Sequence, residues 1–169
     1  VGKFVAAGLS FFVSTSFSKS FSLYGERVGA LSVLCESKEE ADRVLSQLKL
    51  VIRTNYSNPQ IHGGTVVATV LNTPALRAQW EEELTEMRVR IKAMRQKLVD
   101  GLKAAGVTQD MSFITTQIGM FSYSGLTKDQ MVRLRSEFGI YGTDTGRMCV
   151  AALNSKNIDY VCAAIAKVV

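Results

Sequence analysis

Apolar residues recur along this chain with two different periods, and the changes of period predict alternating strands and helices. The runs at residues 9–13 and 28–35 are short enough for strands, and the second is apolar on both sides, as in a strand that is covered on both faces. Later segments place apolar residues every three or four positions, which predicts helices. The helices are expected at residues 37–53, 61–71, 74–105 and 127–138, the last of these capped by Thr127, and a final helix is expected to be capped by Asn154. Further strands are expected at 112–124, 140–141 and 148–153. This order is typical of an α/β first part followed by an α+β second part.

Capping residues fix where several of these helices begin. Ser37 has the N-cap position and Glu40 follows three residues later, as in a capping box. Thr73 precedes Pro74, which suits the first helical position. Two apolar helix faces are predicted to be core: Ala41, Val44, Leu45, Leu48, Val51 and Ile52 in the first, and Leu76, Trp80, Leu84, Met87, Ile91, Met94, Leu98 and Leu102 in the long helix.

Composition narrows the class of protein. The chain has 169 residues and a formal net charge of +5, with basic residues interleaved with glutamates on helical segments. That distribution indicates a solvated helix face and no nucleic-acid partner. Cys35, Cys149 and Cys162 lack paired spacing, and His62 is the only histidine, so we expect free thiols, a cytoplasmic location and no metal site. No apolar run reaches the length of a membrane span, so no membrane partner is expected.

The segment between the first two predicted strands contains the candidate chemistry. It runs from Ser14 to Gly29 and holds one lysine, Lys19, among small hydroxyl residues. A lysine amine condenses with an aldehyde only when deprotonated, which requires a desolvated or cationic setting. Ser16, Ser18 and Arg27 could bind a dianionic phosphate. Together these groups suggest pyridoxal 5′-phosphate, although a lone lysine in a serine-rich turn is usually a solvated surface residue.

The ordered segment resembles the lysine motif of the class I, fold-type I pyridoxal-phosphate aminotransferases, Ser-x-Ser-Lys-x-x-x-Leu-Tyr-x-x-Arg-x-Gly. Seven residues match it position by position: Ser16, Ser18, Lys19, Leu23, Tyr24, Arg27 and Gly29. The resemblance implies that Lys19 forms the aldimine with the cofactor and that Ser16, Ser18 and Arg27 bind its phosphate. It also implies an α/β fold: the end of a large domain with a mostly parallel sheet and helices, followed by a smaller α+β domain.

The resemblance extends to three residues that would bind substrate. Arg147 matches the arginine that clamps the substrate α-carboxylate, although an internal ion pair would also explain an arginine beside an apolar strand. Arg53 matches the arginine that reaches the neighbouring active site of a homodimer, although an arginine at a helix C-terminus often only complements the helix dipole. Phe121 matches an aromatic residue near the substrate side chain, and core packing is the alternative.

The implied reaction is transamination between an amino acid and a 2-oxo acid, with glutamate and 2-oxoglutarate as the shared pair. The segments 20–27 and 147–154 most resemble bacterial aromatic-amino-acid (tyrosine) aminotransferases, and aspartate aminotransferase is the near alternative. One departure is Asp144-Thr145, where smaller uncharged residues are more usual, so the loop contacts there are open.

The family pattern also needs residues upstream of the lysine motif, and this chain begins about 18 residues before Lys19. We therefore expect residues 1–80 to be the C-terminal part of the large domain and residues 81–169 to be the small domain, joined by the long helix 74–105. An enzyme is expected of the parent protein, whereas this chain alone is expected not to be competent. Two other classes stay open: a silent fragment that only folds or associates, and a basic binding module, against which the charge distribution argues.

Overall fold

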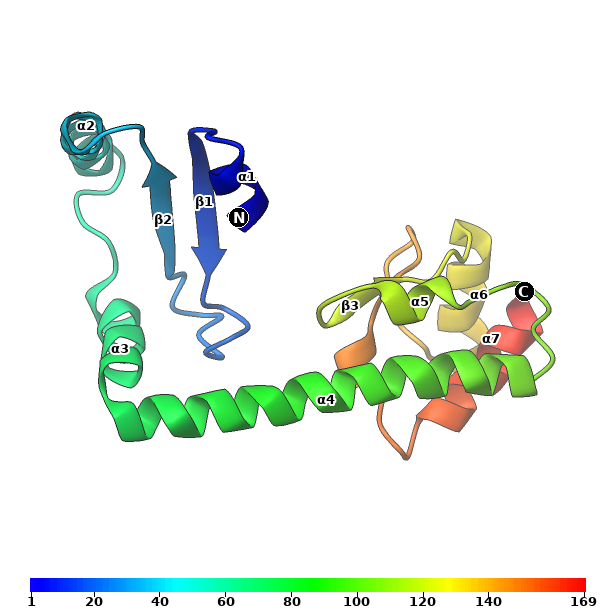
Figure 1. Cartoon of the computed structure of the whole chain (residues 1–169). Helices are drawn as coiled ribbons and strands as arrows, with labels where there is room; N and C mark the ends of the chain where they lie inside the picture. The colour runs from blue at the N-terminus through cyan, green and yellow to red at the C-terminus, as the bar shows by residue number, and fades with distance from the viewer. The chain divides into compact units, whose positions relative to one another are not determined.

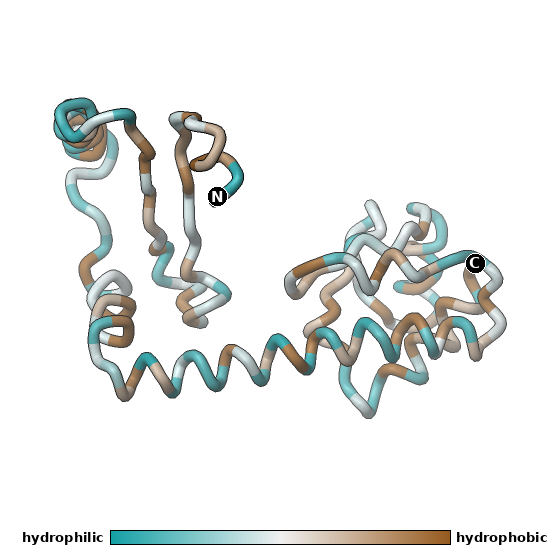
Figure 2. The backbone as a smooth tube through the Cα atoms, viewed as in Figure 1, coloured by the Kyte–Doolittle hydropathy of each residue, from teal (hydrophilic) through white to brown (hydrophobic).

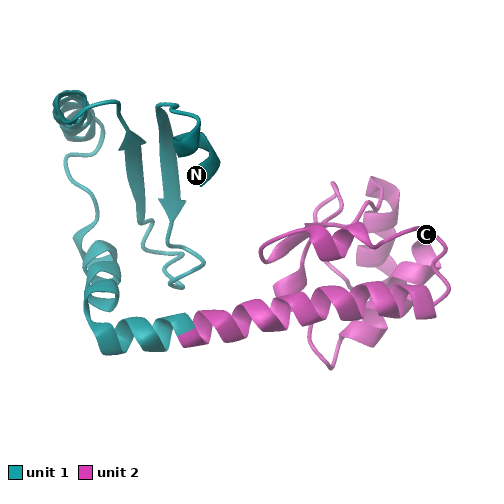
Figure 3. Cartoon of the chain, in the orientation of Figure 1, with its two compact units in different colours: residues 1–81 teal, residues 82–169 magenta.

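The computed structural model describes residues 1–169, and the chain divides into unit 1, residues 1–81, and unit 2, residues 82–169 (Figure 3). Unit 1 contains α1 (Gly2–Ala6), β1 (Phe11–Ser16), β2 (Gly29–Leu34), α2 (Lys38–Asn55) and α3 (Ile61–Asn72). The long helix α4 (Pro74–Ala104) begins in unit 1 and continues into unit 2 (Figure 1). Unit 2 adds α5 (Phe113–Thr116), β3 (Phe121–Tyr123), α6 (Lys128–Phe138), β4 (Arg147–Cys149), the 3₁₀ helix η1 (Val150–Ala152) and α7 (Ile158–Val168).

The predicted domains, 1–80 and 81–169, stay a prediction. The long helix, predicted at 74–105, is confirmed as α4.

The strands of unit 1 form an antiparallel pair. β1 and β2 are in register from Phe11 opposite Leu34 to Ser16 opposite Gly29. A single loop, residues 17–28, connects β1 to β2, as in a hairpin, and strands joined in this way run antiparallel. The mostly parallel sheet expected for the large domain is therefore not found among the strands of this chain. The strands approach so closely at this end that a Cβ on Gly29 would lie 2.5 Å from the Thr15 carbonyl oxygen. Only glycine fits there.

Unit 1 buries very little apolar surface. None of the residues of α2 is buried, and the apolar face predicted to be core is only partly covered: Val44, Leu48 and Ile52 are half-buried, whereas Leu45 is 51% and Val51 55% exposed. That prediction was wrong for this chain, because an amphipathic stripe is buried only when another element packs on it. Hydrophobic segments also run along β1 and β2 without cover from a second layer (Figure 2).

The helices α2 and α6 have the predicted N-caps, Ser37 and Thr127, with one change of partner. The Ser37 hydroxyl accepts from the Glu40 N–H at 3.1 Å, as predicted. The Glu40 carboxylate accepts from the Glu36 N–H at 2.7 Å instead of returning to Ser37. The N-terminus of α6 has the complete reciprocal box between Thr127 and Gln130.

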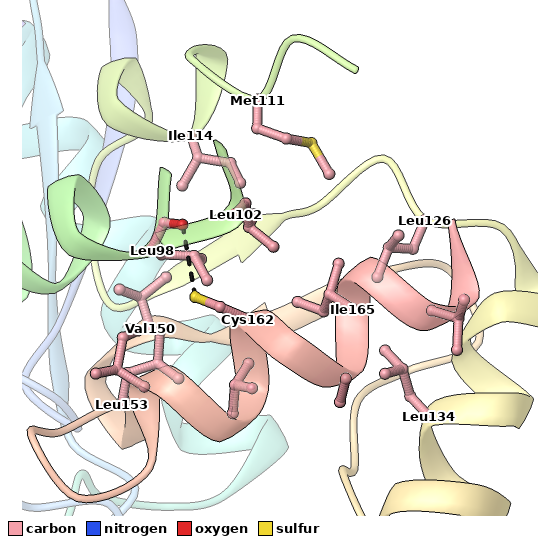
Figure 4. Packing of buried hydrophobic residues seen from close by; sticks show 14 of the residues in the cluster. Leu98, Leu102, Met111, Ile114, Leu126, Leu134, Val150, Leu153, Cys162 and Ile165 are labelled. Carbon is pink, nitrogen blue, oxygen red and sulfur yellow. Dashed lines mark hydrogen bonds between the residues drawn. The ribbon is translucent and has the colours of Figure 1, made fainter. Parts of the chain in front are cut away.

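Unit 2 has a continuous apolar core, shown in Figure 4. Leu98 and Leu102 of α4 pack with Leu134 of α6 and Ile165 of α7, and all four side chains are at most 1% exposed. The remaining members are Met94, Met111, Ile114, Leu126, Met131, Val150, Leu153, Ile158, Val161, Cys162, Ala164 and Val168. The apolar stripe of the long helix is therefore core only from Met94 onward, since Leu76 and Met87 are 41% and 49% exposed.

Three predicted strands of unit 2 differ from the structure. Residues 112–124 form the short helix α5 and then the three-residue strand β3, because Ile114 turns into the core. Residues 140–141 are not a strand, and residues 148–153 divide into the end of β4 and η1. The last helix begins at Ile158, with Asn157 as its N-cap, so the prediction that Asn154 caps it was wrong.

Two other kinds of feature are absent from the structure. No helix has both the length and the apolar composition that a membrane span needs. No cluster of three or more histidine, cysteine, aspartate or glutamate side chains is arranged to hold a metal ion. The three cysteines are free thiols.

We expect Leu98→Ala to lower the free energy of unfolding of unit 2 by about 2–5 kcal/mol, because it opens a cavity in a filled core. The matched control is Leu76→Ala, which removes the same atoms from a 41% exposed position on the same helix. Urea unfolding followed by circular dichroism measures both variants. Equal losses from the two substitutions would contradict this description of the core.

Candidate functional site

The loop between β1 and β2 gathers the cofactor residues predicted from the sequence. Ser16 ends β1, and its hydroxyl accepts from the Ser18 N–H at 3.2 Å. The Lys19 ammonium lies 4.1 Å from the centroid of the Tyr24 ring, and the Arg27 guanidinium lies 5.4 Å from the same centroid. The structure therefore places the amine and the guanidinium beside the same ring, that of Tyr24, and the two serines next to each other at the end of β1.

Arg27 has a backbone conformation that few residues adopt. Its φ is +53°, in the left-handed region, which disfavours residues with a Cβ. Its guanidinium donates to the Tyr24 carbonyl oxygen at 2.9 Å, which closes the turn 24–27. Strained residues held in this way concentrate at functional sites, so the observed outlier supports a binding role for this turn.

Trp80, on α4 within unit 1, anchors the lysine loop. Its indole N–H donates to the Ser20 carbonyl oxygen at 2.7 Å, next to Lys19 in sequence. The Phe21 ring stacks on the indole with centroids 4.6 Å apart, and Phe17 meets Phe21 edge-on at 5.5 Å. The aromatic cluster fixes the residues on both sides of Lys19.

Lys19 itself is exposed. The desolvated setting that the sequence argument requires is therefore not provided by the residues of this chain, because unit 1 places no layer over the loop. The aromatic face of Tyr24 supplies a contact for the lysine side chain but not burial.

Arg53 lies in the last turn of α2 and is exposed. Its guanidinium donates to the Ser57 hydroxyl at 2.5 Å, four residues further along the chain. The position at the helix C-terminus agrees with the simple helix-dipole explanation. The role of Arg53 in a neighbouring subunit stays a prediction.

Unit 2 brings Arg147 and Phe121 together. They lie on the paired strands β4 and β3, and the Arg147 guanidinium is 5.0 Å from the centroid of the Phe121 ring. The alternative for Arg147, an internal ion pair, is not supported, because Arg147 makes no ion pair with a carboxylate. The alternative for Phe121, core packing, is not supported either, because this side chain is 38% exposed. An exposed guanidinium without an anionic partner, held beside an aromatic ring, can bind a carboxylate in bidentate fashion.

The unusual Asp144-Thr145 pair has local partners. The Asp144 carboxylate accepts from the Arg135 guanidinium at 2.6 Å, and the Thr145 hydroxyl lies 2.8 Å from that of Thr143. The negative charge of Asp144 is therefore paired with Arg135 and not with Arg147.

Sequence reasoning missed two residues that organise these groups. The sequence predicts Trp80 only as a member of an apolar stripe, since an indole N–H gives no signal of its own. Arg95 is not among the predicted residues, although it is 2% exposed and donates to four acceptors. A signal existed for Arg95: it falls on the same helical face as Ile91, Leu98 and Leu102, at spacings of four, three and four residues.

Comparison with known proteins identifies the family. A family model described as aminotransferase class I and II matches residues 3–165. The chain belongs to this family. The fold predicted from the sequence is thereby confirmed at the level of the class I aminotransferases, whose solved members have similar structures.

Individual relatives carry two different names. The chain is 63% identical over 165 residues to the aspartate aminotransferase of Pseudomonas aeruginosa and 55% identical over 163 residues to the aromatic-amino-acid aminotransferase of Escherichia coli. These matches cover 98% and 96% of this chain but 42% and 41% of the relatives, so the chain spans about two fifths of their length.

A solved structure is similar over the same extent. It is the aromatic-amino-acid aminotransferase from Burkholderia pseudomallei covalently bound to pyridoxal phosphate, with 68% sequence identity and a TM-score of 0.93. The alignment covers 98% of this chain and 41% of that one.

We expect Trp80→Phe to lower the free energy of unfolding of unit 1 by about 1 kcal/mol, since it removes the hydrogen bond to Ser20 while keeping an aromatic ring against Phe21. It should also speed proteolytic cleavage within residues 17–28. The control is Arg77→Gln, which removes only the exposed ion pair with Glu81 (2.9 Å). Circular dichroism and limited proteolysis with mass mapping measure both effects, and equal cleavage rates in the two variants would refute the anchoring role.

Proposed function

We propose that this chain supplies the lysine and the carboxylate-binding arginine of a pyridoxal-phosphate aminotransferase. The proposal rests above all on the loop 17–28 of a family member, where Lys19 and Arg27 lie beside Tyr24 and the Ser18 N–H donates to the Ser16 hydroxyl. The proposed division of labour assigns residues 1–80 to the large domain and residues 81–169 to the small domain, joined by the long helix.

The donor set fits the cofactor. Pyridoxal phosphate carries an aldehyde and a dianionic phosphate, and the loop offers a primary amine together with the hydroxyls of Ser16 and Ser18 and the Arg27 guanidinium. When bound, the cofactor supplies an electron-accepting ring that stabilises negative charge at the substrate Cα. Lys19 would hold it covalently, and Ser16, Ser18 and Arg27 would bind its phosphate.

The chain's own residues then have distinct tasks. Arg147 binds the α-carboxylate of the amino acid with its two parallel N–H donors, which fixes the direction of the Cα–H bond. Phe121, 5.0 Å from that guanidinium, contacts the substrate beside it. The Lys19 amine takes the proton from the substrate Cα and returns it later in the reaction.

The proposed substrates are an aromatic amino acid, such as tyrosine or phenylalanine, and 2-oxoglutarate, with aspartate as a further substrate. The names of the relatives support both choices, because they include aromatic-amino-acid and aspartate aminotransferases at 55% and 63% identity. Arg53 is proposed to bind a distal carboxylate in the neighbouring subunit of a homodimer. Three free thiols support a cytoplasmic location.

The exposed apolar surface of unit 1 favours a second candidate, a chain that folds or associates without acting as an enzyme on its own. Phe12, Leu31 and Ile61 are 68%, 53% and 80% exposed. Exposed apolar strands need a further partner. The two candidates differ in whether this chain alone binds the cofactor at Lys19.

The first test is borohydride trapping of pyridoxal phosphate, followed by peptide mass mapping. We expect a label on Lys19 that is absent in Lys19→Ala and unchanged in the control Lys3→Ala, which alters an exposed lysine of α1. Binding should also quench the fluorescence of Trp80, the only tryptophan of the chain, because its indole contacts the lysine loop.

The same measurement is made on a chimeric enzyme, in which this chain replaces the matching segment of the P. aeruginosa aspartate aminotransferase. A label in the chimeric enzyme but not in the chain alone would support the second candidate for the isolated chain. No label on Lys19 in either protein would refute the proposed function.

Substitution of the two arginines should separate their roles. In the chimeric enzyme, Arg147→Lys should lower kcat/KM for every amino acid by roughly 10²-fold, since a charge-assisted bidentate contact is lost. Arg53→Leu should lower kcat/KM for aspartate by a similar factor and leave that for phenylalanine within about threefold, because only aspartate has a distal carboxylate. Steady-state kinetics with both amino acids measures this, and equal losses for the two substrates in Arg53→Leu would refute its assignment.

A further inference from the structure

Arg95 is a buried cation without a buried anion. Its side chain is 2% exposed, among the core residues Met94 and Leu98 of α4, and it makes no ion pair. Burial lowers the pKa of the guanidinium from its ordinary value, which reflects the cost of removing the charge from water. A well-packed apolar side chain often stabilises a core as much as a buried charged one, or more. Stability alone therefore does not account for an arginine at this position.

Four acceptors compensate the charge, and all of them lie within residues 114–122. One terminal nitrogen donates to the Ile114 carbonyl oxygen at 2.9 Å and to the Ser122 hydroxyl at 2.8 Å. The other donates to the carbonyl oxygens of Gly119 and Phe121, both at 2.7 Å. The planar guanidinium thus holds α5 at Ile114, the connection at Gly119 and the first two residues of β3 in one fixed geometry.

Further hydrogen bonds connect the acceptors of Arg95 to the rest of β3 through the side chain of Gln117. The Ser122 hydroxyl donates to the Gln117 side-chain oxygen at 2.6 Å, and the same oxygen accepts from the Tyr123 N–H at 2.9 Å. The Gln117 amide returns a bond to the Tyr123 carbonyl oxygen at 3.0 Å. Phe121 and Ser122 are therefore bonded to Arg95 directly, and Tyr123 is linked to it through the side chains of Ser122 and Gln117.

β3 is paired with β4, the strand that contains Arg147. Tyr123 pairs with Arg147 and Phe121 pairs with Cys149 in a two-stranded sheet of three residues per strand. So short a pair has little stability of its own. The position of the Arg147 guanidinium against the Phe121 ring, at 5.0 Å, depends on how β3 is held.

A second arginine of α4 holds the chain that follows β4. Arg90 donates to the carbonyl oxygens of Leu153 and Ala151 at 2.8 and 2.6 Å. Helix α4 therefore fixes the segments on both sides of the β3–β4 pair by guanidinium–carbonyl bonds.

We propose that Arg95 is a positioning residue for substrate recognition: it holds β3 so that Phe121 and Arg147 present one preformed surface to the substrate carboxylate and side chain. The inference rests on the proposed function of Arg147. Lysine cannot replace Arg95, because an ammonium is a single point of donation and cannot reach the same acceptors as the two nitrogens of a planar fork.

The test compares Arg95→Lys with Arg88→Lys, a control at an exposed position of the same helix, in the chimeric enzyme. Arg95→Lys should lower kcat/KM for phenylalanine and aspartate by about tenfold to a hundredfold, since small misplacements of binding groups have effects of that size. It should weaken competitive inhibition by glutarate, a dicarboxylate without a reacting group, to a similar extent. The Lys19 label after borohydride trapping should stay unchanged.

A double-mutant cycle separates positioning from general destabilisation. If Arg95 acts through Arg147, Arg95→Lys should have almost no further effect on glutarate inhibition in an Arg147→Lys background. Additive losses in the double variant would overturn the proposal. It would also be overturned if Arg95→Lys alone left glutarate inhibition and kcat/KM within about twofold of the unsubstituted enzyme.

A second measurement does not depend on activity. In the full chain, nuclear Overhauser effects between the Phe121 ring and the Arg147 side chain should be present, and Arg95→Lys should abolish them while those among core residues such as Leu98 and Ile165 persist. If the effects between Phe121 and Arg147 persisted in Arg95→Lys, the positioning role would be refuted, even if the chain proved unable to bind the cofactor. Absence of the Lys19 label from both the chain and the chimeric enzyme would refute the proposed function. Loss of the Phe121–Arg147 effects in Arg95→Lys would still support the positioning of these two side chains by Arg95.

Discussion

The close approach of α4 to α7 is the constraint on which unit 2 depends. A Cβ on Gly101 would lie 2.6 Å from the Cys162 sulfur, so this helix position must lack a side chain. The Cys162 thiol lies in that space, 3.8 Å from the Leu98 carbonyl oxygen (Figure 4), and its burial raises the pKa of the thiol above the ordinary value. With the two helices in contact, Leu98 and Leu102 complete a filled core. Everything that β3 and β4 present is built on this core.

Unit 1 depends on a different kind of contact. Its two-stranded ribbon has little apolar cover, so the lysine loop is not held by a core. It is held by individual contacts: the indole of Trp80 on the Ser20 carbonyl, the ring of Tyr24 beside two cations, and the guanidinium of Arg27 closing its own turn. Such a loop can be ordered without being buried. This explains how the structure gathers the predicted cofactor residues yet leaves Lys19 exposed.

Arginine has three different tasks in this chain, and burial together with the available partner separates them. Arg95 is buried and satisfied by backbone and hydroxyl oxygens, so its charge is used to hold structure. Arg147 is exposed and has an aromatic neighbour but no anion, which leaves its donors available for a ligand. Arg133 is exposed and pairs with Glu137 at 2.8 Å on its own helix, an arrangement of small energetic consequence.

Local signals in the sequence determined much of this protein. The motif from Ser16 to Gly29, the caps at Ser37 and Thr127, and the periodic stripe of the long helix each depend on neighbouring residues, and each predicted an element or a loop that the structure has. The tertiary structure decided what no local pattern contains. It showed that the β1–β2 pair is antiparallel, that residues 113–116 are helical, and that the face of α2 is not core in this chain. It also showed that Arg95 lies inside the core, because the acceptors that make its burial tolerable are 19 to 27 residues away in sequence. Hydrophobic periodicity says which face of a helix can be buried, whereas only the packed chain decides whether a partner covers it and which distant oxygens meet a buried charge.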